Sequence, residues 1–340
     1  MSSPPKAPPS TSPGAGLLLG MISAVAYMVA SLGLRSVAEA NVSSGDIDWA
    51  IWVSANKAAP VAIAAWSLVA WRALRGLPAL PPRHLLWPLI VTGLIMQWGG
   101  NVSFQYALSR GGLALTVPLS FSTILMSAAV FGRLVLGDPL SRATVSAIGV
   151  MMAAIAVLSQ GMPRATVSDG GAASTVLAVA AACLAGAAYG SGGVMIRRCV
   201  RAHLSVSATI VVLSSTGVVT LGATSLLRIG PRQLLATPPD AWLRMLAAGV
   251  ATAVAFFAIT GAYQHLTAVK VSLLNASQIA LAALAGVVLF NEPNTFWLHA
   301  GTALTILGLV LSARRDVSPG RPAPGRPALA HAAESPTLIE

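Results

Sequence analysis

The stretch "SANKAAPVAIAAWSLVAW", residues 54–71, is apolar almost throughout, yet Lys57 stands near its start. It belongs to a longer run, 49–71, which has the length of about 17–25 residues that a helix needs to cross a lipid bilayer. The whole chain has the same character: 55% of its residues are hydrophobic, 9% are charged, and the mean hydropathy is +0.75. Soluble proteins carry about 25% charged residues, so we infer that lipid surrounds much of this chain.

Apolar runs of membrane-spanning length recur along the whole sequence. Their number predicts an all-α polytopic membrane protein with ten transmembrane helices. The ten runs are 16–35, 49–71, 85–108, 113–136, 140–160, 174–196, 204–227, 241–263, 268–290 and 295–313.

The formal net charge of +11 is spread over the loops rather than gathered on one face, which argues against a nucleic-acid partner. With the N-terminus in the cytoplasm, fourteen of the 21 lysines and arginines fall on the inner side and six on the outer side, while Lys57 falls in the membrane. This asymmetry is the positive-inside bias. It predicts a multi-pass protein of the plasma or inner membrane with both termini in the cytoplasm.

The sequence repeats itself once. "AYMVASLGLR" at 26–35 and "AYGSGGVMIR" at 188–197 share an Ala-Tyr pair with an arginine eight residues after the tyrosine. Two halves of five spans each follow, and because five is odd the second half enters the membrane from the opposite face, as in the inverted repeats of many transporters. The tails are rich in Pro, Ser, Gly and Ala, which predicts disorder. The predicted organisation is a disordered tail 1–15, a first five-helix repeat 16–160, a linker 161–173, a second five-helix repeat 174–313 and a disordered tail 314–340.

Two longer segments, 104–158 and 259–311, also correspond to each other. Each has a small-residue turn, an apolar helix, an acid near the end of that helix, and a final span that contains glycine. Together with the Ala-Tyr segments, this pattern resembles the EamA-type members of the drug/metabolite transporter superfamily over residues 16–313. The resemblance implies ten helices, cytoplasmic termini and a central cavity between the halves. Relatives move amino acids, metabolites, nucleotide sugars or drugs, so the fold alone does not fix the cargo.

The acids in these segments each precede a proline, in "LVLGDPLS" at 134–141 and "VVLFNEPN" at 287–294. We interpret Asp138 and Glu292 as caps of the fifth and tenth spans, with the proline in the first helical turn, where a missing N–H is tolerated. Asp138 departs from the family, whose members usually carry a glutamate there, and the 36–48 loop is longer than usual.

The sequence lacks the motifs of common enzyme classes: no P-loop, HExxH, paired CxxC or GxSxG occurs, and no predicted span holds a deeply placed Asp or Glu. Acid–base or metal catalysis inside the membrane would need several such groups. We therefore predict no enzymatic activity, no cofactor and no metal.

The polar residues inside the spans are mainly amides. Gln97, Asn101 and Gln105 recur every four residues in the third predicted span and so share one helix face. A buried amide without a partner costs on the order of several kcal/mol in hydrocarbon, so these three do not face lipid. They either join helices by hydrogen bonds or line a wet cavity. Asn275 and Gln278, in the ninth predicted span, form a second patch.

Lys57 admits two interpretations. It lies about 13 Å along the second span from Asp48, so it could extend along its own aliphatic stem to the membrane surface. Alternatively it is a functional cation, since Asn56 is its neighbour and Pro60 can open the backbone hydrogen bonding nearby. A cation at this depth is costly unless it meets water or an anion, and the simplest anion is a carboxylate or phosphate of the cargo.

These observations predict a secondary active transporter that exports small metabolites, such as amino acids or other anionic or zwitterionic solutes, by alternating access. The alternatives are a channel, or a polytopic enzyme or scaffold that acts on lipid-linked substrates. The expected partners are the small-molecule substrate, the lipid bilayer and a second copy of the chain in a homodimer. Aromatic residues complete the predicted cavity wall, although they also serve as packing groups and interfacial anchors. The candidate substrate-binding residues are Lys57, Asn56, Gln97, Asn101, Gln105, Asn275, Gln278, Trp98, Tyr27 and Tyr189.

Overall fold

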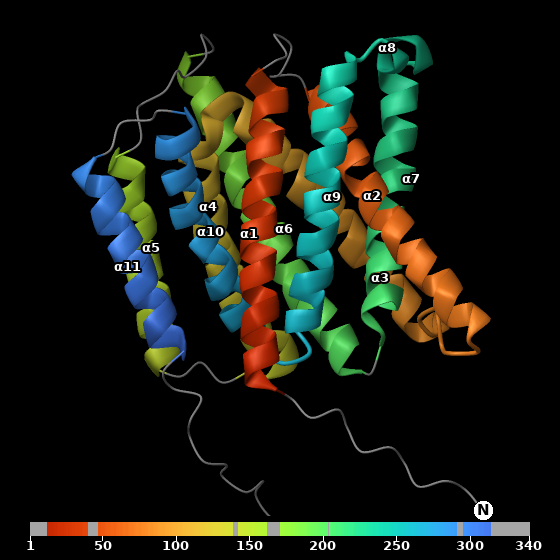
Figure 1. Cartoon of the computed structure of the whole chain (residues 1–340), viewed down its shortest axis with the longest axis horizontal. Coiled ribbons are helices and arrows are strands. Elements are labelled where there is room, and N and C mark those ends of the chain that lie inside the picture. The colour runs from red at the N-terminus through yellow and green to blue at the C-terminus, as the bar shows by residue number, and fades with distance from the viewer. Residues whose placement is uncertain are drawn as a thin grey trace, which may run out of the picture.

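The computed structural model describes residues 12–39, 47–138, 142–161, 171–202, 204–290 and 295–313. Within these ranges the regular structure is entirely helical, and the helices stand side by side as a bundle (Figure 1). The elements are α1 (Pro13–Glu39), α2 (Ile47–Leu74), α3 (Arg83–Leu94), the π-helix η1 (Ile95–Val102), α4 (Ser103–Leu136), α5 (Arg142–Gly161), α6 (Gly171–Arg201), α7 (Val206–Arg228), α8 (Pro231–Leu235), α9 (Pro239–Ala262), α10 (Ala268–Phe290) and α11 (Phe296–Ala313).

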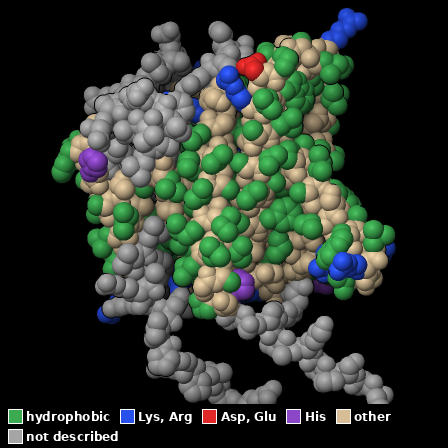
Figure 2. Space-filling model, in the orientation of Figure 1, with side chains coloured by type: hydrophobic (Ala, Val, Ile, Leu, Met, Phe, Trp, Pro, Cys, Tyr) green, Lys and Arg blue, Asp and Glu red, His purple; other side chains and the backbone are tan. Residues whose placement is uncertain are grey.

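Several helices have the length and composition of membrane spans. Seven stretches in the described part of the chain qualify: Pro13–Val37, Ile47–Leu74, Arg83–Arg110, Leu119–Leu136, Val176–Arg201, Val206–Arg228 and Pro239–Ala262. Shorter apolar stretches lie at Val145–Ala154 in α5 and Ala268–Leu281 in α10. On the described part of the side shown in Figure 2, hydrophobic side chains far outnumber charged ones, and Lys and Arg lie near the ends of the bundle. The chain is therefore a multi-pass helical membrane protein.

Most of the described helices begin close to the predicted span boundaries. The exception is α4, which begins at Ser103 within the third predicted span and continues through 109–112, where the sequence predicted a break. α1 begins at Pro13 and α6 at Gly171, each three residues before the predicted start at 16 and 174. The short helix α8, between α7 and α9, has no predicted counterpart. Residues 1–11 of the first tail, 162–170 of the linker, the whole tail 314–340 and the pair Glu292–Pro293 lie outside the described residues. Residues 13–15, predicted as disordered, form the start of α1.

The segment 83–136 is helical throughout, but a straight helix of that length would measure about 80 Å. The ring of Phe104 lies edge-on to Tyr189 of α6, with the ring centres 6.4 Å apart. Gly190, the next residue of α6, lies against the backbone oxygen of Ile124. Residues 104 and 124 therefore meet α6 at the same level, so the chain changes direction between them. The stretches Arg83–Arg110 and Leu119–Leu136 are accordingly two candidate spans rather than one.

The bundle is held together by extensive helix pairs, namely α4 with α6, α1 with α9, α2 with α7, and α5 with α11. Figure 1 shows α11 lying alongside α5, and α1 lying alongside α9. The α4–α6 contact is close because Gly186 and Gly190 present no side chain to α4. A Cβ at these positions would come 2.2 Å from the Ser120 oxygen and 2.6 Å from the Ile124 oxygen. Small residues thus set the distance between these two helices, as is common in membranes.

Candidate functional site

A cavity of about 150 Å³ lies inside the bundle and is lined by side chains from α1, α2, η1, α4, α6, α7, α9 and α10. Its walls therefore combine helices from both predicted repeats. Among its described lining residues, Lys57 is the one charged side chain. A mostly apolar cavity with a few convergent polar groups is the usual form of a small-molecule site.

Lys57 lies in α2 and is 8% exposed. Its side chain does not extend to the helix end: the Nζ atom donates a hydrogen bond of 2.6 Å to Oδ1 of Asn101 on η1. Among the described residues no carboxylate forms an ion pair with Lys57. Pro60 follows within the same helix and packs against Gly249 of α9. The charge is thus held at the cavity wall by a neutral amide.

The amides of η1 continue this arrangement. Asn101 donates from Nδ2 to Oε1 of Gln97 at 2.6 Å, and Gln97 donates from Nε2 to the backbone oxygen of Leu213 on α7 at 3.1 Å. The hydroxyl of Tyr189 on α6 also donates to Oδ1 of Asn101, at 2.6 Å. Hydrogen bonds therefore connect α2, η1, α6 and α7 around Asn101. The sequence left two roles open for these amides, joining helices or lining a cavity. Gln97 and Asn101 do both.

Two glycines make this network geometrically possible. Gly100 lies under the ring of Tyr189, where a Cβ would come 2.7 Å from Cε1. Gly217 of α7 lies against the side-chain amide of Gln97, where a Cβ would come 2.4 Å from Cδ. A larger residue at either position would displace a member of the network.

The second amide patch lies on α10. Asn275 and Gln278 line the cavity, as Tyr27 of α1 does. The hydroxyl of Ser23 donates to Oδ1 of Asn275 at 3.1 Å, and Nε2 of Gln278 donates to the Asn275 backbone oxygen at 2.9 Å. The sequence did not single out Ser23, because a serine in an apolar helix commonly bonds its own backbone.

Three of the candidate site residues lie elsewhere. Asn56 donates to the backbone oxygen of Trp52 at 2.9 Å, and Trp98 donates to the hydroxyl of Thr220 at 3.1 Å. Gln105 is buried, and neither polar atom of its side-chain amide has a partner among the described residues. It lies about 6 Å beyond Asn101 along the helix. None of the three is among the residues that line the cavity.

The apolar part of the wall went unrecognised in the sequence. Phe104, Phe121 and Phe256 line the cavity together with Ile124 and Ile259. Phenylalanines in an apolar span look the same whether they face lipid or a cavity, so spacing alone could not have selected them.

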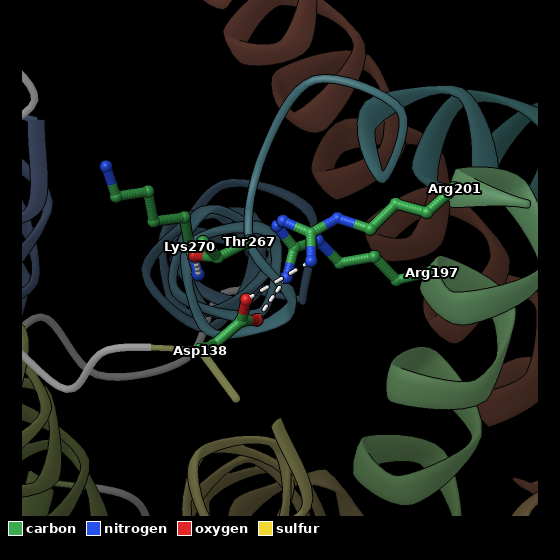
Figure 3. Close-up of polar contacts among 5 residues, drawn as sticks. All are labelled: Asp138, Arg197, Arg201, Thr267 and Lys270. Carbon is green, nitrogen blue, oxygen red and sulfur yellow. Dashed lines mark hydrogen bonds and ion pairs between the residues drawn. The ribbon is translucent and has the colours of Figure 1, made fainter. Parts of the chain in front are cut away.

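A charged cluster lies at one end of the bundle. Arg197 and Arg201 of α6 both reach Asp138, which follows α4 (Figure 3). Arg197 is 4% exposed and Asp138 is 7% exposed. Thr267 and Lys270, at the start of α10, lie beside the pair, and the Lys270 backbone N–H donates to the Thr267 hydroxyl at 3.3 Å. The carboxylate that the sequence assigns to a helix cap thus binds arginines of another helix. Residues 139–141 lie outside the described part.

Among the described residues, no three His, Cys, Asp or Glu side chains are grouped as a metal site would need. The fold and the cavity define the class: a multi-pass helical membrane protein with a mostly apolar cavity that holds a few polar groups among its helices. Residues 176–314, nearly all of the second predicted repeat, match the model of the EamA-like transporter family, which confirms the resemblance to EamA-type members of the drug/metabolite transporter superfamily over that part of the chain. Proteins of this family are generally transporters rather than enzymes.

No curated protein sequence matches this chain significantly. Twenty-eight chains of solved structures do match it. One crystal structure covers 89% of this chain and 97% of its own length, with a TM-score of 0.65 and 20% sequence identity. At that identity the likeness shows the fold alone.

Proposed function

We propose that this protein is a secondary active transporter that exports small metabolites across the plasma or inner membrane by alternating access. The observation that carries the proposal is Lys57, a buried cation on the wall of a cavity lined by helices from both predicted repeats. Buried ionisable groups inside a membrane bundle commonly mark substrate or ion pathways.

The proposal includes ten spans arranged as two inverted repeats, with both termini in the cytoplasm. Helix pairing supports the repeat. The second predicted span packs on the seventh, as α2 on α7, and the fifth packs on the tenth, as α5 on α11. A two-fold axis relating the halves would map each of these pairs onto itself. In the predicted repeat α1 corresponds to α6, and α9 corresponds to the third span, which contains η1 and the first part of α4. The same axis would therefore map the α1–α9 contact onto a contact of α6 with η1 and α4, and α6 does contact both elements.

Alternating access requires the cavity to open to one side at a time while the site stays near the middle of the bundle. Lys57 is ten residues from the start of α2, about 15 Å along the helix axis. This is half the thickness of a hydrocarbon core of about 30 Å, which supports a cation that either side of the membrane can reach in turn.

The test is flux in liposomes that contain the purified protein. Vesicles are loaded with labelled amino acids or organic acids, and efflux is compared between the wild type, Lys57→Met and Lys270→Met. The second variant is the matched control, because Lys270 lies outside the cavity lining. We expect saturable efflux that Lys57→Met abolishes and Lys270→Met keeps.

The rival functions give different results in the same assay. Flux that does not saturate and far exceeds carrier rates would identify a channel. Chemical conversion of the labelled compound would identify an enzyme. The absence of flux for every compound, with protein that is folded by its melting curve, would overturn the transporter.

A further inference from the structure

The hydrogen-bond chain behind Lys57 has a fixed polarity. An ammonium group can only donate, so the oxygen rather than the nitrogen of the Asn101 amide must face it. The Asn101 nitrogen must then donate to the Gln97 oxygen, and the Gln97 nitrogen to the Leu213 carbonyl. Each amide turns its oxygen toward the lysine and its nitrogen away from it. Aligned dipoles of this kind stabilise a positive charge at Nζ.

The hydrogen bonds of this network occupy only part of the donor capacity of the Lys57 ammonium group. Among the described residues it donates to Asn101, and an ammonium has three N–H donors. Oδ1 of Asn101 already accepts a second hydrogen bond, from Tyr189. Two donors of a supported cation are therefore left for a molecule in the cavity that Lys57 lines.

The rest of the cavity suits a small apolar group. Phe104, Phe121 and Phe256 line it, and its volume is about 150 Å³. An apolar cavity of about this volume can hold a benzene molecule. A ligand of this size could carry one charged group at Lys57 and place a ring or branched chain against the phenylalanines.

Charge then separates the possible ligands. A monoanion cancels the lysine charge, a zwitterion leaves one positive charge in the cavity, and an amine raises it to two. Uncompensated charge is expensive where the dielectric constant is low. In a carrier, the loaded cavity must also change sides within the bilayer, where charged groups cost most. A net anion is the ligand that meets both requirements.

We infer that the cavity selects a small organic monoanion, with its carboxylate on Lys57 and an aromatic or branched apolar body against Phe104, Phe121 and Phe256. This inference rests on the proposed transport function and narrows its cargo: zwitterionic amino acids and cationic amines are excluded as preferred ligands. Asn101 and Gln97 act as positioning residues, because they orient and support the lysine.

The test uses three compounds with the same ring and different charge: phenylacetate, phenylalanine and 2-phenylethylamine. Their binding to the full-length purified protein is measured by calorimetry, and counterflow in liposomes is measured in parallel. We expect phenylacetate to bind at least about tenfold more tightly than the other two, which corresponds to about 1.4 kcal/mol. Lys57→Met should remove that preference, and Lys270→Met should keep it.

A second variant tests the inference independently, in case the Lys57→Met protein fails to fold. Asn101→Asp keeps the shape of the side chain and places a carboxylate on the ammonium, so the cavity becomes neutral before any ligand enters. We expect this variant to lose phenylacetate binding and to bind phenylalanine at least as well as the wild type does.

The outcomes distinguish this inference from the transport proposal. Counterflow of phenylalanine without phenylacetate binding would leave the transporter standing and overturn the anion site. Phenylacetate binding that depends on Lys57, without counterflow of any compound, would support the anion site and overturn transport. Equal affinity for all three compounds, or unchanged phenylacetate binding in Asn101→Asp, would overturn the inference.

Discussion

Replacement of Asp138 by asparagine should destabilise the bundle far more than the loss of a carboxylate from an exposed ion pair. Asp138 is 7% exposed and Arg197 is 4% exposed. Arg197 reaches the carboxylate through Nη1, and its Nε atom has no hydrogen-bond partner among the described residues. The variant leaves the guanidinium buried and unpaired. Removing one partner of a buried pair costs about 3–5 kcal/mol. Arg201 cannot compensate, because it carries the same charge as Arg197.

The measurement is thermal unfolding of the purified protein in detergent, followed by size-exclusion chromatography. A change of 1 kcal/mol shifts the midpoint by about 2–4 °C in chains of 150–250 residues, so on that scale we expect Asp138→Asn to lower it by about 6–20 °C. The matched control is Asp240→Asn, which breaks the exposed Asp240–Arg244 pair, 3.5 Å between Oδ2 and Nη2. Exposed pairs contribute about 0–1 kcal/mol, so this midpoint should hardly move.

A double variant separates the lost pair from a local packing defect. Asp138→Leu combined with Arg197→Met removes both buried charges, and apolar replacement of a buried pair is often neutral or stabilising. Its midpoint should lie well above that of Asp138→Asn. If Asp138→Asn and Asp240→Asn shift the midpoint equally, the reasoning from burial is refuted.

Two further predictions concern the cavity. Gly217→Ala should displace the Gln97 amide, since its Cβ would lie 2.4 Å from Cδ, and so reduce efflux severalfold; Gly222→Ala in the same helix meets nothing within 4 Å and should transport normally. Equal rates for the two variants would show that the Gln97 position does not matter for transport. In a background without Cys183 and Cys199, Asn101→Cys should react with a small water-soluble thiol reagent and Gln105→Cys should not. Rapid labelling of Gln105→Cys would extend the cavity beyond the lining described here.

The sequence predicted the helices and several cavity residues because both depend on local patterns. Long apolar runs mark helices in lipid, and amides four residues apart share a face, so Gln97 and Asn101 were found together. The same pattern could not show how far the cavity extends, and Gln105 lies beyond its described lining. The hydrogen bonds of the amides to Leu213, Tyr189 and Ser23 on neighbouring helices could not be predicted, because these groups meet only in the folded bundle. Tyr189 itself was a candidate, but its hydrogen bond to Asn101 was not foreseen.

The Asp138–Arg197 ion pair is a second contact between distant residues that the sequence did not predict. Its members are 59 residues apart in the chain. An acid before a proline at a helix start has a sufficient local explanation as a cap, so nothing in the neighbouring residues pointed to an arginine of α6. Long-range charge pairs of this kind need either a structure or the comparison of many related sequences.

The π-helix that carries Gln97 and Asn101 has a consequence for how such a protein can change over evolutionary time. A π turn holds more residues than an α turn, and such bulges concentrate at functional sites. Loss of one residue within Ile95–Val102 can be absorbed by conversion to α turns, while α3 keeps its packing on α7 and α4 keeps its packing on α6. The length of the chain at this point is therefore set by the cavity wall rather than by the bundle. Insertion or deletion of a single residue here is a route by which a descendant gains a differently shaped cavity on an unchanged scaffold.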